Sequence, residues 1–197
     1  MRGHTMVWEG ESNWGPDAVA VYNSSILTDQ EKGDSLVNIL DDHIYHVIPK
    51  WDVECWDVVN EPWGNQQVNE LLPSTNTLVY WFKLADSLRQ VYGKPNLQLA
   101  VNENSIISNN LLNSDSKIEQ YMGILDTMIL EGAPIEMLGF QSRIKNGMLS
   151  PDTIYSRLVK FERYGLPYQA TEFELKDSPN YYYTPTEIKQ ATEESMI

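Results

Sequence analysis

The stretch "ECWDVVNEPW", residues 54–63, decides the fold. Its apolar run from Cys55 to Val59 has the length of a buried strand, and the run ends on Asn60 and Glu61 before a proline. A charge buried without a partner is costly, but a carboxylate at the tip of a strand avoids that cost while it stays rigidly held. The stretch therefore predicts a buried strand that presents polar side chains at its carboxyl end.

Four more short apolar runs occur along the chain. Segments with apolar residues at helical spacing separate the runs, so that strand and helix alternate five times. This alternation predicts an α/β fold with a mostly parallel sheet and helices packed outside it. The four runs are residues 4–8, 97–101, 135–140 and 168–173.

The predicted helices have recognisable first and last residues. Thr28 and Glu31 form a capping box before one helix, and the helix predicted over 77–92 stops at Gly93. The segment 9–26, which follows the first run, is long and aromatic and predicts a binding loop. The other predicted helix starts are Ser114, Ser150 with a proline after it, and a second capping box at Thr184.

Parallel α/β chains form either open sheets or closed barrels. A nucleotide-binding open sheet needs a glycine-rich turn after its first strand, and the sequence has neither this turn nor a Walker motif. In barrels, catalytic residues lie at the carboxyl ends of several strands. Polar residues follow four of the predicted strands in this way, which favours a barrel. They are Asn60 and Glu61, residues 102–104, residues 141–143, and Glu172.

Composition and charge exclude several classes of partner. The 197 residues carry a formal net charge of −14, whereas nucleic acids and anionic membranes bind basic patches. Neither is therefore an expected partner. No apolar run approaches the roughly 20 residues that span a bilayer. The single cysteine, Cys55, excludes an internal disulfide and a cysteine metal cluster.

Four ordered motifs together resemble glycoside hydrolase family 10, the retaining xylanases built on a (β/α)8 TIM barrel. The motifs are "RGHTMVW" (2–8), "WDVVNEPW" (56–63), "LGFQS" (138–142) and "ATEFEL" (170–175). The resemblance covers nearly the whole chain. It implies one barrel domain over residues 1–197, truncated at both ends, with five strands that resemble the third to the seventh of the family. A full barrel takes about 250 residues.

The resemblance assigns the chemistry to two carboxylates. Glu172 is the implied nucleophile, which attacks the anomeric carbon, and Glu61 is the implied general acid/base, which protonates the leaving oxygen and then deprotonates water. Asn60 would hydrogen-bond the sugar 2-hydroxyl. No metal or organic cofactor is required. The other implied substrate-binding residues are His4, Trp8, Asn102 and Gln141.

The sequence departs from the family pattern beside the implied nucleophile. Arg143 replaces a histidine, and Glu174 replaces the aspartate that pairs with it. An Arg143–Glu174 ion pair with activity kept is one interpretation, and altered specificity or lost activity is the other. Two smaller departures also affect the substrate. Asn104 stands where the family commonly has tyrosine, and Glu11 where it commonly has glutamine.

The resemblance implies an extracellular endo-β-1,4-xylanase-like hydrolase that acts on xylan or a related plant cell-wall polysaccharide. Two alternatives stay open. The first is a carbohydrate-binding relative in which Arg143 and truncation have impaired catalysis. The second is a β-glucanase of the same barrel clan. The oligomeric state does not follow from the sequence.

Overall fold

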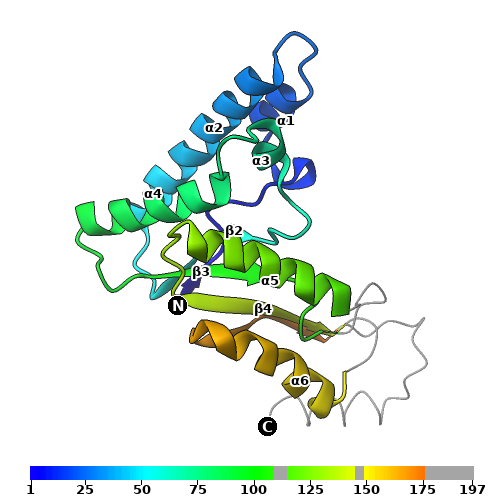
Figure 1. The fold of residues 1–197 in the computed structure, drawn as a ribbon. Helices are drawn as coiled ribbons and strands as arrows, with labels where there is room; N and C mark the ends of the chain where they lie inside the picture. The colour runs from blue at the N-terminus through cyan, green and yellow to red at the C-terminus, as the bar shows by residue number, and fades with distance from the viewer. Residues whose placement is uncertain (109–114, 145–148, 176–197) are drawn as a thin grey trace.

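A computed structural model describes residues 1–108, 115–144 and 149–175. They contain a five-stranded sheet in the order β1-β2-β3-β4-β5, and every neighbouring pair of strands is parallel (Figure 1). Because each strand lies beside the next strand in the chain, the sheet is the continuous half of a (β/α)8 barrel, as predicted. The strands are β1 (Arg2–Gly3), β2 (Cys55–Asn60), β3 (Gln98–Glu103), β4 (Met137–Ile144) and β5 (Tyr168–Leu175).

Helices connect successive strands, and α4 packs directly against β2 and β3. The apolar faces of the helices and the sheet form one core, in which Trp81, Phe82 and Tyr121 are fully buried. The helices are α1 (Pro16–Tyr22), α2 (Asp29–Lys50), α3 (Gln67–Leu71), α4 (Thr77–Val91), α5 (Asp115–Leu130) and α6 (Pro151–Phe161), with the 3-10 turns η1 (Glu11–Asn13) and η2 (Glu162–Tyr164).

The first strand is shorter than predicted. The apolar run 4–8 does not form a continuous strand, because β1 ends at Gly3 and pairing with β2 resumes only at a bridge between Val7 and Val59. The pairing of β1 with β2 depends on glycine at position 3, because the ring of Trp56 occupies the space that a Cβ atom there would need. Because of this break, His4 lies outside the hydrogen-bonded pairing of β1 with β2, and its side chain faces other strands.

The segment 9–26 is not the open loop that its length predicted. Pro16 begins α1 at the first helical position, and Ala18 is buried where α1 packs against α2. This helix has only seven residues, so the spacing of its apolar residues is too short a pattern to distinguish it from a loop.

Predicted caps are found at three helix ends. The backbone N–H of Glu31 donates to Thr28 Oγ1 at 3.3 Å, and that of Thr28 donates to Glu31 Oε2 at 2.9 Å. Ser150 caps α6 by accepting from the N–H of Thr153. α4 stops two residues before Gly93, whose φ of 68° only glycine adopts freely. The starts predicted at Ser114 and Thr184 lie outside the described residues.

Candidate active site

Glu61 and Glu172 lie at the same edge of the sheet and share an unusual backbone conformation. Their φ angles are 54° and 50°, in the left-handed region that non-glycine residues rarely occupy. Glu61 directly follows β2. Glu172 lies at an irregularity of β5, because Gln141 pairs with Thr171 but Arg143 pairs with Glu174. The extra residue on β5 is a β-bulge, which turns the Glu172 side chain away from its regular direction.

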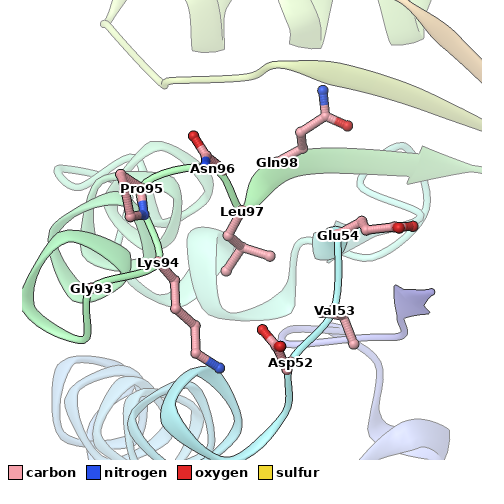
Figure 2. Close-up of a pocket in the computed structure, with 9 residues that line it drawn as sticks. All are labelled: Asp52, Val53, Glu54, Gly93, Lys94, Pro95, Asn96, Leu97 and Gln98. Carbon is pink, nitrogen blue, oxygen red and sulfur yellow. The ribbon is translucent and has the colours of Figure 1, made fainter.

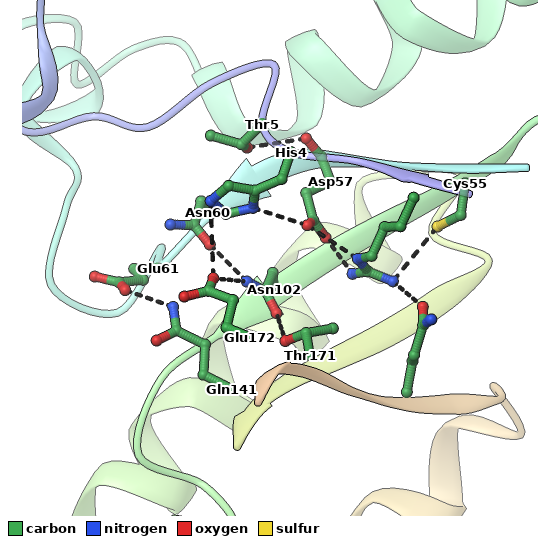
Figure 3. A network of polar contacts seen from close by, with 12 residues as sticks. His4, Thr5, Cys55, Asp57, Asn60, Glu61, Asn102, Gln141, Thr171 and Glu172 are labelled. Atoms are coloured by element: carbon green, nitrogen blue, oxygen red, sulfur yellow. Dashed lines mark hydrogen bonds and ion pairs between the residues drawn. The ribbon is translucent and has the colours of Figure 1, made fainter. Parts of the chain in front are cut away.

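Neutral groups surround Glu61. Gln141 Nε2 donates to Glu61 Oε1 at 2.6 Å (Figure 3). The Glu61 N–H donates to the carbonyl of Asn102 at 2.7 Å, and the Glu61 carbonyl accepts from Asn65 Nδ2 at 3.1 Å. Gln141 therefore fixes the carboxyl group without adding a charge to it, and the other two contacts fix the backbone of Glu61.

An arginine, a histidine and an amide surround Glu172. Arg143 donates to Glu172 Oε2 from Nε at 3.0 Å and from Nη2 at 2.6 Å, and His4 Nε2 lies 3.7 Å from Oε1. The remaining oxygen accepts from Asn102 Nδ2 at 2.8 Å. Arg143 Nη1 lies 3.8 Å from Glu174 Oε2, so Arg143 forms ion pairs with both glutamates and is closer to Glu172. The side chain of Glu172 is 14% exposed, and its carboxylate accepts hydrogen bonds at both oxygens.

Asn102 joins the two strand ends. Its amide nitrogen donates to Asn60 Oδ1 at 2.8 Å as well as to Glu172, and its oxygen accepts from Thr171 Oγ1 at 2.6 Å. Asn60 is fully buried, yet its Nδ2 has no hydrogen-bond partner in the described part of the chain. An amide donor without a partner at this edge is available to a ligand oxygen.

His4 is held by a buried carboxylate. Its Nδ1 lies 3.0 Å from Asp57 Oδ2, and Asp57 also accepts from Arg2 Nε at 3.0 Å. The hydrogen bond that His4 donates to the Asp57 carboxylate raises the pKa of His4 above its ordinary value. The ring of Trp8 meets that of His4 edge-on, with 6.0 Å between their centroids. His4 and Trp8 therefore adjoin the Glu172 side of the site.

Sequence reasoning missed Arg2, Asp57 and Thr171 as supporting residues. A signal for Asp57 was present, since an acidic residue inside the apolar run 55–59 needs a partner. The residues at the two smaller departures from the family pattern both form polar contacts. Glu11 Oε1 accepts from Asn23 Nδ2 at 2.5 Å, and Asn104 Oδ1 accepts from Lys117 Nζ at 2.6 Å.

The described residues contain no group of three histidine, cysteine, aspartate or glutamate side chains arranged to hold a metal ion. Cys55 is a free thiol, and burial raises its pKa to about 11. Among the same residues, no helix is both long and apolar enough to cross a membrane.

Comparison with known proteins agrees with this geometry. Residues 1–196 match the family model described as glycosyl hydrolase family 10. Endo-1,4-beta-xylanase A of Halalkalibacterium halodurans is 27% identical over 188 residues, covering 89% of this chain and 45% of the relative. Endo-1,4-beta-xylanase B of Thermotoga neapolitana is also 27% identical, over 92% of this chain and 50% of the relative. The chain thus spans about half the length of these curated relatives.

Solved structures resemble the fold. Native xylanase 10B from Thermotoga maritima superposes with a TM-score of 0.68 at 25% identity, covering 98% of this chain and 55% of that one. Xylanase B from Clostridium stercorarium F9 gives a TM-score of 0.70 at 21% identity, covering 98% and 60%. The family model covers nearly the whole sequence. The chain belongs to glycosyl hydrolase family 10.

Proposed function

We propose that this protein contributes the two catalytic carboxylates of a retaining hydrolase that cleaves β-1,4-xylosidic bonds in xylan. The observation that carries the proposal is the single polar network at the sheet edge. Asn102 contacts both strand ends, while Gln141 and Arg143 on β4 reach Glu61 and Glu172 respectively. The names of the matched relatives supply the substrate class. Since xylan is a cell-wall polymer too large to enter a cell, the proposed place of action is extracellular.

The first chemical step breaks the glycosidic bond. Glu172 attacks the anomeric carbon and forms a glycosyl ester, and Glu61 transfers its proton to the departing oxygen. Gln141 holds Glu61 Oε1 by donating to it, which leaves Oε2 to carry that proton. The partnerless Asn60 Nδ2 donates to a hydroxyl of the sugar, a contact that can strengthen in the transition state.

The second step restores the enzyme. Glu61, now ionised, takes a proton from water while the water oxygen attacks the anomeric carbon and displaces Glu172. Arg143 and His4 lie beside the departing carboxylate, where positive charge stabilises it. Two inversions at the same carbon give net retention.

The test uses the chain as it is. Incubation with soluble xylan should release new reducing ends, and Glu172→Ala should abolish the release. Proton NMR of the first product should show the β anomer, because the mechanism retains configuration. Equal turnover by Glu172→Ala, or an α first product, would contradict the proposal. Faster cleavage of linear β-1,4-glucan than of xylan would instead assign the chain to the β-glucanase alternative.

One observation favours a second candidate, a carbohydrate-binding protein without catalysis. Arg143 places two N–H groups on Glu172 Oε2, and a permanent cation in this contact weakens the carboxylate as a nucleophile. The same incubation separates the candidates. Xylo-oligosaccharide binding with no release of reducing ends, restored to turnover by Arg143→His, would support the binding protein.

A further inference from the structure

A pocket of about 390 Å³ lies between α5 and the N-terminal ends of α3 and α4, outside the two-carboxylate site. The pocket and that site include residues that are close in the sequence, because Trp63 of the pocket stands two residues after Glu61. The lining of the pocket combines an indole, four amides and a hydroxyl with the apolar side chains of Leu78, Ile124 and Met128, and none of its described lining residues is charged. The residues that carry the indole, the amides and the hydroxyl are Trp63, Gln66, Asn69, Asn76, Gln120 and Thr127.

A second pocket of similar volume provides the contrast. It measures about 420 Å³ and lies at the amino ends of β2 and β3, on the side of the sheet away from Glu61 (Figure 2). Loop backbone and the charged side chains of Asp52, Glu54 and Lys94 line it, and none of its described lining residues is aromatic. Volume alone therefore does not distinguish the two pockets, whereas chemistry does.

Trp63 is fixed in place from three directions. Its backbone N–H donates to the buried Glu103 at 3.0 Å, and its Nε1 donates to Gln120 Oε1 at 3.1 Å. Lys117 Nζ, paired with Glu103 at 3.1 Å, lies 4.6 Å from the centroid of the indole ring. The residue nevertheless stays 38% exposed. An indole that is already ordered loses little entropy when a ligand stacks on it.

The amides of the pocket are also oriented by the protein. Gln66 Nε2 donates to the carbonyl of Pro62 at 2.8 Å. Asn76 Oδ1 caps α4 by accepting from the N–H of Val79 at 3.3 Å, which leaves Asn76 Nδ2 without a partner in the described part of the chain. The oxygens of Gln66, Asn69 and Gln120 already accept from Asn69, Thr77 and Trp63 respectively. Each amide oxygen can accept a second hydrogen bond, and Asn76 Nδ2 can donate, so both functions that a sugar hydroxyl needs are present.

We propose that this pocket is a second carbohydrate-binding site, which holds a neutral pyranose unit of a polysaccharide outside the catalytic carboxylate pair. The apolar C–H face of the pyranose stacks on Trp63, and its hydroxyls exchange hydrogen bonds with the amides. The identity of the sugar as xylose rests on the proposed function. By holding one part of a long chain, the site raises the effective concentration of the rest near Glu61 and Glu172.

Binding is measured directly by NMR. The chain is labelled with ¹⁵N and titrated with xylobiose in the Glu172→Ala background, so that the ligand survives. The indole N–H signal of Trp63 is assigned by its loss in Trp63→Phe, a variant that keeps a flat ring. The Trp63 signal should shift on titration. Trp63→Ala should weaken binding at this pocket roughly tenfold, equivalent to about 1.4 kcal/mol.

Two further variants show whether weaker binding results from a general loss of structure. Asn76→Asp keeps an oxygen to cap α4 but removes the free N–H donors, so it should weaken binding while α4 stays intact by circular dichroism. Trp51→Ala is the matched control, since Trp51 is 51% exposed and is not a lining residue of the pocket. It should bind as the unsubstituted chain does.

The outcomes separate this proposal from the proposed function. Binding that needs Trp63 and the Asn76 amide, in a chain that does not cleave xylan, would leave the site standing and overturn only the activity. In an active chain, Trp63→Ala should raise KM for polymeric xylan and leave cleavage of an aryl xylobioside unchanged. A Trp63 signal that does not shift on titration, or Trp63→Ala and Asn76→Asp variants that bind like Trp51→Ala, would overturn the site.

Discussion

Glu61 and Glu172 share a backbone conformation but have unlike surroundings. Both lie at the carboxyl edge of the sheet with φ near 50°, but Glu61 contacts amides and Glu172 contacts an arginine, a histidine and an amide. A proton donor must keep its proton until the bond breaks, so uncharged neighbours suit it. A nucleophile must be ionised, so cations suit it, up to the point at which they reduce its reactivity. The neighbours, rather than the strand ends, therefore distinguish the two proposed roles.

The strongest test of this contrast removes Glu172. Glu172→Ala should lower turnover of every substrate by at least roughly 1,000-fold, whatever the leaving group, because no glycosyl ester can form. Initial rates on xylan and on aryl xylosides measure the effect. Added azide should then react at the vacated face and give the α-glycosyl azide. A β-azide would show that another group is the nucleophile.

Glu61→Gln should have a smaller and selective effect. General acid catalysis increases the rate about 100- to 10,000-fold. A substrate whose leaving group needs no proton should lose less of this rate in the first step. The measurement compares xylan with a dinitrophenyl xyloside, whose bond-breaking step should be nearly unaffected. Gln141→Glu, which puts a charge beside Glu61, serves as a companion variant and should shift the pH dependence of turnover. An equal loss on both substrates would remove Glu61 from the acid/base role.

Arg143→Gln tests whether the cation restrains the nucleophile. The variant keeps one N–H donor for Glu172 and removes the charge, and we expect the rate of glycosyl ester formation to rise by up to about tenfold, the value of one charge-assisted hydrogen bond. Burst kinetics with an activated aryl xyloside report that step. Arg163→Gln, which removes a surface ion pair with Asp126, is the control. A tenfold fall would show that Arg143 positions Glu172.

The smallest expected effect concerns stability. Because the folded pKa of His4 is raised above 6.5, its pairing with Asp57 stabilises the fold fully below pH 6.5 and is lost as pH rises through the folded pKa. Glu172 adds to the rise and Arg2 opposes it. Urea midpoints at pH 5.5 and 9 should therefore differ less in His4→Gln than in the unsubstituted chain. His4 is 36% exposed, so solvent screening keeps the difference small.

The regular parts of the fold follow from local signals. Strands β2 to β5 coincide with apolar runs and α2, α4 and α6 with caps, since both patterns reflect burial and hydrogen bonding within a few residues. The extent of the first strand and the presence of α1 could not be predicted from local signals. The break after Gly3 depends on the ring of Trp56, more than 50 residues later in the chain, which no local pattern reports.

For the site, the sequence predicted the carboxylates but not their neighbours. Motif resemblance located Glu61 and Glu172, whereas their assigned roles remain predictions. The links through Gln141 and Asn102 depend on how four strands align, a tertiary property. Glu9 illustrates the same limit, because this buried carboxylate accepts from the N–H groups of Val68 and Asn69 on a five-residue helix with no clear sequence signal.

The left-handed backbone at Glu61 and Glu172 has a consequence for the evolution of this chain. Glycine adopts φ near 50° without strain, whereas any side chain there costs on the order of 1 kcal/mol. Replacing either glutamate with glycine would relieve this strain, but it would remove a carboxylate that the proposed mechanism needs. Persistence of glutamate at both positions in a lineage would be a sign that catalysis, rather than folding, has preserved them.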